Sequence, residues 1–223
     1  MKSQVATDSS PVGGAFLPVP FCAVLEEPAV AAIDSAEREL RGRAATDENR
    51  CAGFFPTLSG VPGIDSDFPS CRDLMRLVPK IEHEGRVYRF NFMRLSLVCQ
   101  ACQPAWHIDS DAATALTGVD VSPASRLIHR LLLNLSGTRE RVMAYLDVDV
   151  LTAGLVQDGG YIRPANTETA AGTALSISIP VREGPVVHGI SFVSNRIFHS
   201  GQDGADGHFL AAYGCEVSTS AQM

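Results

Sequence analysis

The sequence predicts a mainly β protein, an antiparallel sandwich of two sheets with helices on one side, and the double-sheet jelly roll is its most specific form. Three observations lead to this fold class. Helical patterns come first in the 223-residue chain, short alternating strands follow from residue 86, and Gly, Pro and Asp turns separate most of these strands. The length suffices for one sizeable core. We expect a single jelly-roll domain with N-terminal helices over residues 15–217, between a loosely ordered segment at 1–14 and a tail at 218–223.

Two helices are expected before the strands. Residues 26–43 place apolar side chains at helical spacing and Pro28 in the first turn, where proline is tolerated; the apolar positions are Val30, Ile33 and Leu40. Residues 72–78 predict a second, short helix that ends before Pro79. The stretch between them, residues 49–70, is rich in Gly, Pro, Asp and Ser and predicts an extended loop.

Seven strands are expected after the helices. In residues 86–98 the aromatic side chains alternate, so Tyr88, Phe90 and Phe92 should share one face of the strand and Met93 should lie on the other. The remaining candidates are residues 126–135, 141–150, 174–179, 186–193, 195–199 and 208–217. Residues 154–173 predict a second long loop, of the kind that often covers a binding site.

Composition argues against several classes of partner. The net charge is −7, the pI is about 5.3, and Lys and Arg form no cluster, so neither nucleic acid nor an anionic membrane is an expected partner. No apolar run is long enough to span a membrane, and the N-terminus lacks the apolar core of a signal peptide. We therefore expect a cytoplasmic protein whose six cysteines are reduced. Cys99 and Cys102 form a C-x-x-C pair, but no second pair completes a zinc site.

Two segments carry the chemistry, Trp106-His107-Ile108-Asp109 and Ser194-Asn195-Arg196-Ile197-Phe198-His199. On a strand, residues i and i+2 point to the same side, so His107 and Asp109 can bind one metal while Ile108 faces the other way. His199 is expected to supply the third ligand from the end of another strand. Two histidines and one carboxylate leave open coordination positions and suit non-haem Fe(II). His188 is the alternative to His199.

These segments resemble those of the Fe(II)/2-oxoglutarate-dependent oxygenases. In that superfamily a double-stranded β-helix carries H-x-D at the start of its second core strand and the distal histidine on its seventh. The resemblance implies that His107, Asp109 and His199 are the catalytic iron ligands, with 2-oxoglutarate as co-substrate and O2 as oxidant. It further implies hydroxylation, or another oxidation, of a C–H bond in a small molecule such as an amino acid or a natural-product intermediate. The oligomeric state is open.

The resemblance fails at one position. Members of the superfamily usually carry an arginine or lysine about ten residues after the distal histidine, where it binds the far carboxylate of 2-oxoglutarate. Residues 207–213 contain neither, and His208 comes closest. Some branches supply the cation from the strand after H-x-D, which here carries Arg126 and Arg130 on one parity, together with Asn134. Arg130 is slightly favoured over Arg126 because it lies further inside the strand.

Alternative roles for these residues stay open. Arg126 and Arg130 could equally form ion pairs with acidic neighbours, and Arg94 on the preceding strand is a third candidate for the co-substrate. Two other functions also fit the sequence. One is a cupin-like iron oxygenase that does not use 2-oxoglutarate, and the other is a jelly-roll binding module without catalysis.

Overall fold

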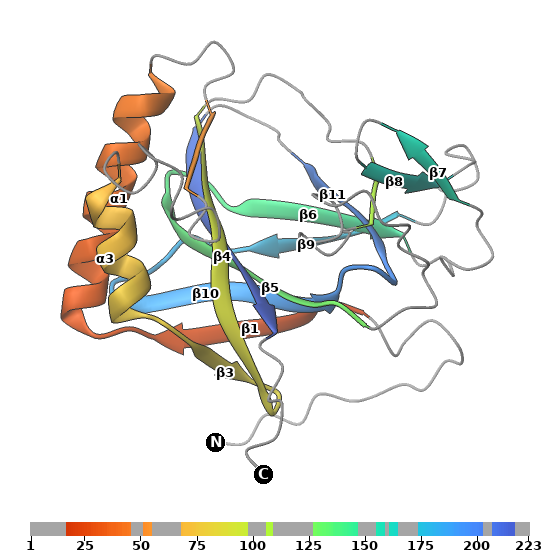
Figure 1. Cartoon of the computed structure of the whole chain (residues 1–223), viewed down its shortest axis with the longest axis horizontal. Helices are drawn as coiled ribbons and strands as arrows, with labels where there is room; N and C mark the ends of the chain where they lie inside the picture. The colour runs from red at the N-terminus through yellow and green to blue at the C-terminus, as the bar shows by residue number, and fades with distance from the viewer. Residues whose placement is uncertain are drawn as a thin grey trace.

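The chain folds as a jelly roll of two antiparallel sheets, with helices on the outer face of the larger one (Figure 1). The structure, a computed structural model, describes residues 17–45, 51–54, 68–97, 106–108, 127–146, 155–158, 161–164, 174–202 and 207–216. The helices within these ranges are α1 (Glu27–Ala44) and α3 (Pro69–Leu77). The strands are β1 (Val19–Val24), β2 (Cys51–Phe54), β3 (Ile81–His83), β4 (Arg86–Leu97), β5 (His129–Gly137), β6 (Arg141–Leu146), β7 (Leu155–Asp158), β8 (Tyr161–Pro164), β9 (Ala174–Ile179), β10 (Val186–Val193), β11 (Phe198–Gln202) and β12 (His208–Glu216).

The strand order confirms the predicted jelly roll. The larger sheet has the order β1-β10-β5-β12-β4-β2, with β3 paired to β4, and the smaller sheet has the order β11-β6-β9. All these pairs are antiparallel, and most neighbours in a sheet are far apart in the sequence. Residues 106–108 lie at the free edge of β11 through a bridge between His107 and His199, and they also contact β8 through Ile108 and Ile162.

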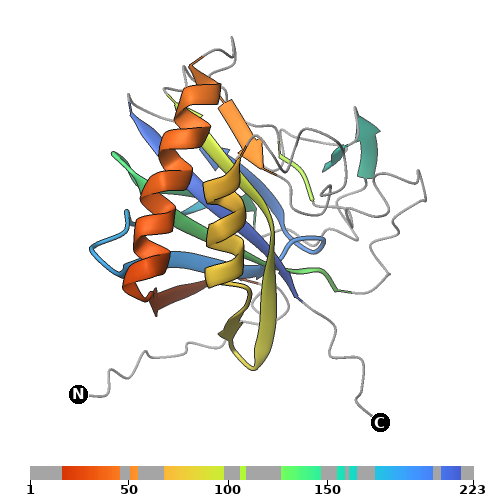
Figure 2. The same ribbon diagram turned by 60° about the vertical axis from the view of Figure 1, so that its left-hand side comes forward.

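The two helices cover one face of the larger sheet (Figure 2). Helix α1 begins one residue after the predicted start and buries one stripe of side chains at helical spacing, namely Ala29, Ile33, Ala36, Leu40 and Ala44. Helix α3 begins three residues before its predicted start and buries Cys71 and Leu74. These side chains form one core with the outward-facing residues of the sheet, including Leu131 and Leu133 of β5.

The other face of the larger sheet meets the smaller sheet and forms a second core. Leu132 of β5 lies there, together with Phe209 and Ala211 of β12 and Ile190 and Phe192 of β10. Alternation along each strand therefore separates a core under the helices from a core inside the jelly roll. We call the space between the two sheets the lumen.

Met93 does not lie on the predicted face of β4. It joins Tyr88 and Phe90 in the core under the helices and is fully buried. The register of β4 against β12 shifts between Phe92 and Phe90, so β4 carries one extra residue there. Such a bulge reverses the alternation along the strand, which a strict two-residue period cannot anticipate.

Both predicted loops contain regular structure. Strand β2 lies within the loop predicted at 49–70, and strands β7 and β8 form a hairpin within the loop predicted at 154–173. Strand β1, at the edge of the larger sheet, was not predicted. The terminal segments at 1–14 and 218–223, and Cys99 and Cys102, lie outside the described residues. Neither of the two helices described has the length and apolar character needed to cross a membrane.

Candidate metal centre

His107 and His199 face one another across two neighbouring strands. The amide of His107 donates to the carbonyl of His199 at 3.1 Å, and the amide of His199 donates to the carbonyl of His107 at 2.9 Å. Residues that exchange both backbone hydrogen bonds in an antiparallel pair are direct partners, and their side chains lie on the same side of the sheet. The two imidazole rings accordingly lie with their centroids 4.5 Å apart. The structure thus brings together two of the three predicted ligands.

The environment of His199 sets the orientation of its ring. His199 is 6% exposed, and its Nδ1 lies 3.1 Å from the carbonyl oxygen of Ile197. A carbonyl only accepts, so Nδ1 carries the proton and Nε2 is the acceptor nitrogen of the ring, the arrangement typical of a metal-binding histidine. The ring of Phe192 packs edge-on against it at 5.0 Å.

A tight turn places His199 near the start of β11, not at the end of the strand expected at 195–199. The side chain of Asn195 is buried and its Oδ1 accepts a hydrogen bond of 2.9 Å from the amide of Ile128. The amide of Ser194 donates to the carbonyl of Ile128, and the amide of Arg196 donates back to Val193. Residues 194–196 therefore connect β10 to β11 while bonded to the residue just before β5.

Ile108 points away from the two histidines, as the alternation predicts. It is 2% exposed and packs with Leu146 and Phe198, while Trp106 packs against the same cluster. Asp109, the predicted third ligand, lies outside the described residues, and no group of three or more His, Cys, Asp or Glu side chains suited to a metal occurs within the described ranges. Its place beside His107 remains a prediction from the H-x-D spacing.

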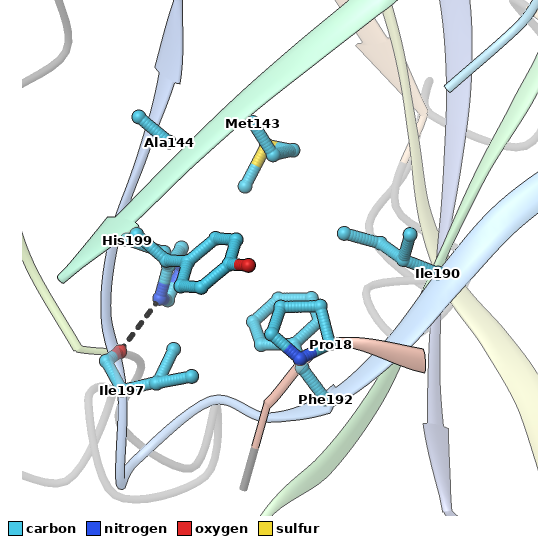
Figure 3. A pocket seen from close by; sticks show the side chains of 8 residues that line it. Pro18, Met143, Ala144, Ile190, Phe192, Ile197 and His199 are labelled. Carbon is cyan, nitrogen blue, oxygen red and sulfur yellow. Dashed lines mark hydrogen bonds between the residues drawn. The ribbon is translucent and has the colours of Figure 1, made fainter. Parts of the chain in front are cut away.

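A small pocket opens beside His199 (Figure 3). It encloses about 180 Å³, part of it open to solvent, and lies between the two sheets. Its walls are mostly apolar and come from the segment before β1 and from strands and turns of both sheets, with the lining residues Pro18, Met143, Ala144, Tyr145, Ile190, Phe192, Ile197 and His199. Tyr145 of β6 is the direct strand partner of His199. Mostly apolar walls with a few polar groups, here His199 and Tyr145, are typical of small-molecule sites.

Arg130 lies at the same end of the lumen as the histidine pair. It is 8% exposed and lies in β5 between Phe192 of β10 and Cys215 of β12. Its guanidinium contacts the sulfur of Cys215. Phe192 lines the pocket and packs against His199. Arg130 is its partner on the neighbouring strand, so Arg130 lies next to the pocket wall and not in it. Arg126, its predicted alternative, lies outside the described residues, as does the side chain of Arg94.

Asn134 lies at the opposite end of the lumen from His199. Its amide nitrogen donates to the carbonyl of Ile179 at 3.2 Å and approaches that of Arg139 at 3.4 Å, which ties β5 to the smaller sheet. His188 is the strand partner of Asn134. It lies four residues from Phe192 along β10, about 13 Å of strand, so it does not join His107 and His199.

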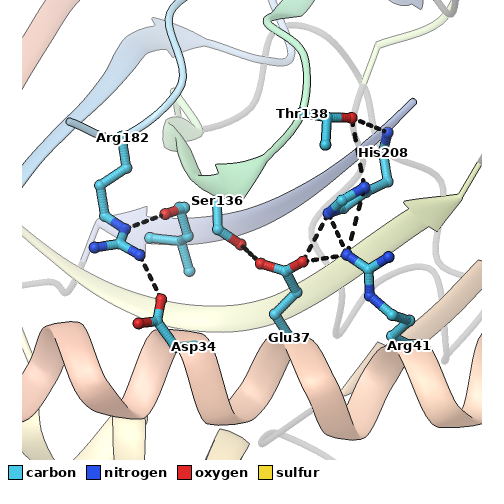
Figure 4. A network of polar contacts seen from close by, with 8 residues as sticks. Asp34, Glu37, Arg41, Ser136, Thr138, Arg182 and His208 are labelled. Atoms are coloured by element: carbon cyan, nitrogen blue, oxygen red, sulfur yellow. Dashed lines mark hydrogen bonds and ion pairs between the residues drawn. The ribbon is translucent and has the colours of Figure 1, made fainter. Parts of the chain in front are cut away.

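His208 lies on the outer face of the larger sheet, away from the histidine pair. Its Nε2 lies 2.6 Å from Oε1 of Glu37 in helix α1, and its amide donates to Oγ1 of Thr138 at 3.1 Å (Figure 4). Glu37 also accepts a hydrogen bond of 2.5 Å from the hydroxyl of Ser136 and forms an ion pair with Arg41. The side chain of His208 thus joins the larger sheet to helix α1. Side chains alternate along β12, and because Phe209 faces the lumen, His208 faces the helix.

Two residues that face the lumen were not predicted from the sequence. Arg141 begins β6, is 7% exposed, and holds its guanidinium carbon 4.3 Å from the ring centroid of Phe209. Tyr145, on the same strand, lines the pocket. The signal was present, because Arg141, Met143 and Tyr145 alternate along a predicted strand, but nothing in the sequence showed which face of that strand is enclosed.

Comparisons with known proteins support the fold. No family model matches the chain, and no curated protein is significantly similar to it in sequence. Among solved structures, the epimerase SnoN in complex with Fe3+, alpha ketoglutarate and nogalamycin RO is similar at a TM-score of 0.51 and 14% identity, over 90% of this chain and 78% of SnoN. AviO1 from Streptomyces viridochromogenes Tue57 is similar at 0.49 and 14% identity, over 92% of both chains. The non-heme monooxygenase ThoJ is similar at 0.47 and 19% identity, over 90% of this chain and 74% of ThoJ.

Proposed function

We propose that the protein is a non-haem Fe(II) oxygenase that uses 2-oxoglutarate and O2 to hydroxylate, or otherwise oxidise, a C–H bond of a small molecule. The observation that carries this proposal is the direct pairing of His107 with His199 inside a jelly roll. With Asp109 as third ligand, the set would be the two-histidine, one-carboxylate site that leaves coordination positions open for co-substrate and oxygen.

The donors fit such a metal. Two imidazoles lie on one side of adjacent strands, and the hydrogen bond from Nδ1 of His199 to Ile197 presents Nε2 as its donor to a metal. A bound iron would supply oxygen activation, while the chain's own residues hold and shield the reacting groups. The apolar walls formed by Met143, Ile190 and Phe192 would exclude water from that chemistry.

The fold is compatible with the proposed co-substrate. SnoN shares the overall fold and was crystallised with Fe3+ and alpha ketoglutarate, which is 2-oxoglutarate. SnoN is an epimerase, so a jelly roll of this kind is not restricted to hydroxylation. The proposal therefore specifies attack on a C–H bond and leaves the fate of the carbon to the substrate, an amino acid or a natural-product intermediate.

Metal analysis tests the ligand set directly. We expect purified wild-type protein to bind one Fe(II) under anaerobic conditions, and His107→Ala, Asp109→Ala and His199→Ala each to lose most of it. His188→Ala is the matched control, because His188 lies in β10 outside the pair, and it should retain iron. Unchanged iron content in all three ligand variants would refute the proposed metal site.

Binding of 2-oxoglutarate tests the co-substrate without knowledge of the substrate. Addition of 2-oxoglutarate to the anaerobic Fe(II) protein should produce a weak visible charge-transfer band, since the keto acid chelates the metal. Iron binding without this band would favour the second candidate, a cupin-like iron oxygenase that does not use 2-oxoglutarate. That candidate is supported by the last strand, where Phe209 faces the lumen and residues 207–213 contain no arginine or lysine.

A further inference from the structure

We propose that the pocket beside His199 receives an uncharged, apolar part of the substrate, which reaches it past Tyr145 and Leu175 at the β9 edge of the smaller sheet. This inference rests on the proposed function, because it names the class of group that the same site would oxidise. An alkyl chain is such a group. An amino acid would place its side chain, and not its charged groups, in this pocket.

A row of paired side chains connects the candidate metal centre to the surface. His107 is bridged to His199, and Tyr145 of β6 is the strand partner of His199. Leu175 of β9 is in turn the strand partner of Tyr145. Direct partners in an antiparallel sheet lie on the same face, with their Cβ atoms about 5 Å apart. The row therefore runs from a histidine that is 6% exposed to a leucine that is 45% exposed, at the edge of the smaller sheet.

The larger sheet contributes its own edge to the same pocket. Pro18 lines the pocket and directly precedes β1, the edge strand of that sheet. Because Val19 is the strand partner of Ser191, Pro18 lies beside Phe192, as Figure 3 shows. Leu17, the residue before Pro18, is 37% exposed. Exposed apolar side chains next to both sheet edges thus flank the pocket, an arrangement found at ligand-binding grooves.

The walls of the pocket favour an alkyl group over a charged one. Met143, Ile190 and Phe192 present apolar side chains, and the polar side chains among the described lining residues are those of His199 and Tyr145. A charged group loses its hydration in such surroundings, whereas each buried methylene strengthens binding about fourfold. The enclosed volume of about 180 Å³, similar to that of roughly six water molecules in the liquid, has room for a short alkyl chain.

The experiment compares two alcohols that differ at one end. 1-Hexanol ends in a methyl group, whereas 6-amino-1-hexanol carries an ammonium group there at neutral pH. Their binding is measured by saturation-transfer NMR on the full chain, with Fe(II) under anaerobic conditions and without metal, so the readout does not depend on turnover. 1-Hexanol should bind, and 6-amino-1-hexanol should bind at least about tenfold more weakly. Equal affinities would overturn the apolar character of the site.

Leu175→Asp tests where the alcohol binds. A carboxylate next to Tyr145 should weaken the binding of 1-hexanol about 3- to 10-fold, because the alkyl chain would then contact a hydrated charge. Leu77→Asp is the matched control, since Leu77 is 49% exposed but belongs to helix α3 on the outer face of the larger sheet (Figure 2). This variant should bind 1-hexanol as wild type does. An equal effect of the two substitutions, or no effect of Leu175→Asp, would overturn the path past Leu175.

Failure of the apolar pocket is distinct from failure of the proposed function. A protein that binds iron but not 1-hexanol would refute the apolar substrate group and leave the metal site in place. A protein that binds 1-hexanol, and loses this binding in Leu175→Asp, but cannot bind iron would support the pocket and refute the oxygenase. Metal analysis and alcohol binding on the same preparation therefore separate the two proposals.

Discussion

At the residue scale, neighbouring strands approach closely at Gly189 of β10. A Cβ added there would collide with the carbonyl oxygen of Leu132 and lie 2.6 Å from a methyl group of Leu133. We expect Gly189→Ala to lower the free energy of unfolding by about 1–3 kcal/mol, because the buried backbone of β5 at Leu132 must move. Urea denaturation monitored by circular dichroism measures this change.

Gly42 provides the matched control for that substitution. It lies in helix α1, and an added Cβ would meet no atom within 4 Å. Gly42→Ala should therefore stabilise the protein by about 0.5–1 kcal/mol, since alanine has the higher helix propensity. Equal effects of the two substitutions would show that the contact at Leu132 does not limit position 189.

Glu37 makes the stability of the helix–sheet contact depend on pH. Burial raises the pKa of its carboxyl, but hydrogen bonds with Ser136, Arg41 and His208 outweigh burial and hold this pKa below the usual range. A carboxyl whose pKa is lowered by folding adds stability above its unfolded pKa, about 4.3, and loses it as the pH falls through the folded value.

The contribution of Glu37 is the difference in free energy of unfolding between wild type and Glu37→Gln. At pH 7 the variant should be less stable by about 1–3 kcal/mol, and the difference should shrink below pH 4.3. Urea denaturation across pH 3–7 measures it. Asp73→Asn is the control, because the ion pair of Asp73 with Arg76 is exposed and contributes little. A gap that stays constant down to pH 3 would contradict this role of Glu37.

At the element scale, helix α3 depends on a side chain of helix α1. The carboxylate of Glu39 accepts hydrogen bonds from the amide of Ser70 at 2.9 and 3.0 Å and from its hydroxyl at 2.6 Å. No side chain of α3's own N-cap residue, Phe68, provides this cap. Glu39 therefore serves as the N-terminal cap of α3 from outside the helix, since the first amides of a helix lack partners within it.

Removal of this cap should loosen α3 before the rest of the fold. We expect Glu39→Ala to cost about 1–2 kcal/mol and Glu39→Gln less, because the amide oxygen still accepts. Hydrogen exchange would show faster exchange in α3 than in β5 for the alanine variant. A uniform increase over both elements would contradict a local role for Glu39.

The strands show which features of the fold the sequence can and cannot predict. The strands at 174–179 and 186–193 agree with β9 and β10 residue by residue, because their alternation and flanking turns are local signals. The face of Met93 and the end of the strand at His199 were wrong, since a bulge and the buried side chain of Asn195 depend on distant partners. Tyr145 became recognisable as a pocket residue only when the structure showed which face of β6 the lumen encloses.

At the scale of the whole molecule, the helices pack against the larger sheet, while the candidate metal centre lies at the edge of the smaller one. Residues 106–108 are joined to the remaining described chain by the bridges from His107 to β11 and from Ile108 to β8. A metal held by His107 and His199 would link this segment to β11 through side chains as well. Metal binding should therefore stabilise the smaller sheet at the edge where few backbone hydrogen bonds act.

This linkage predicts a metal-dependent gain in stability that needs no substrate. Under anaerobic conditions, Fe(II) at about 100 times its dissociation constant should raise the free energy of unfolding of wild type by about 2.7 kcal/mol, since a ligand that binds only the folded state stabilises it. His199→Ala should show little of this gain, and His188→Ala should show all of it. Trp106, next to His107, reports the transition by fluorescence. An equal gain in wild type and in His199→Ala would place the stabilising metal elsewhere in the molecule.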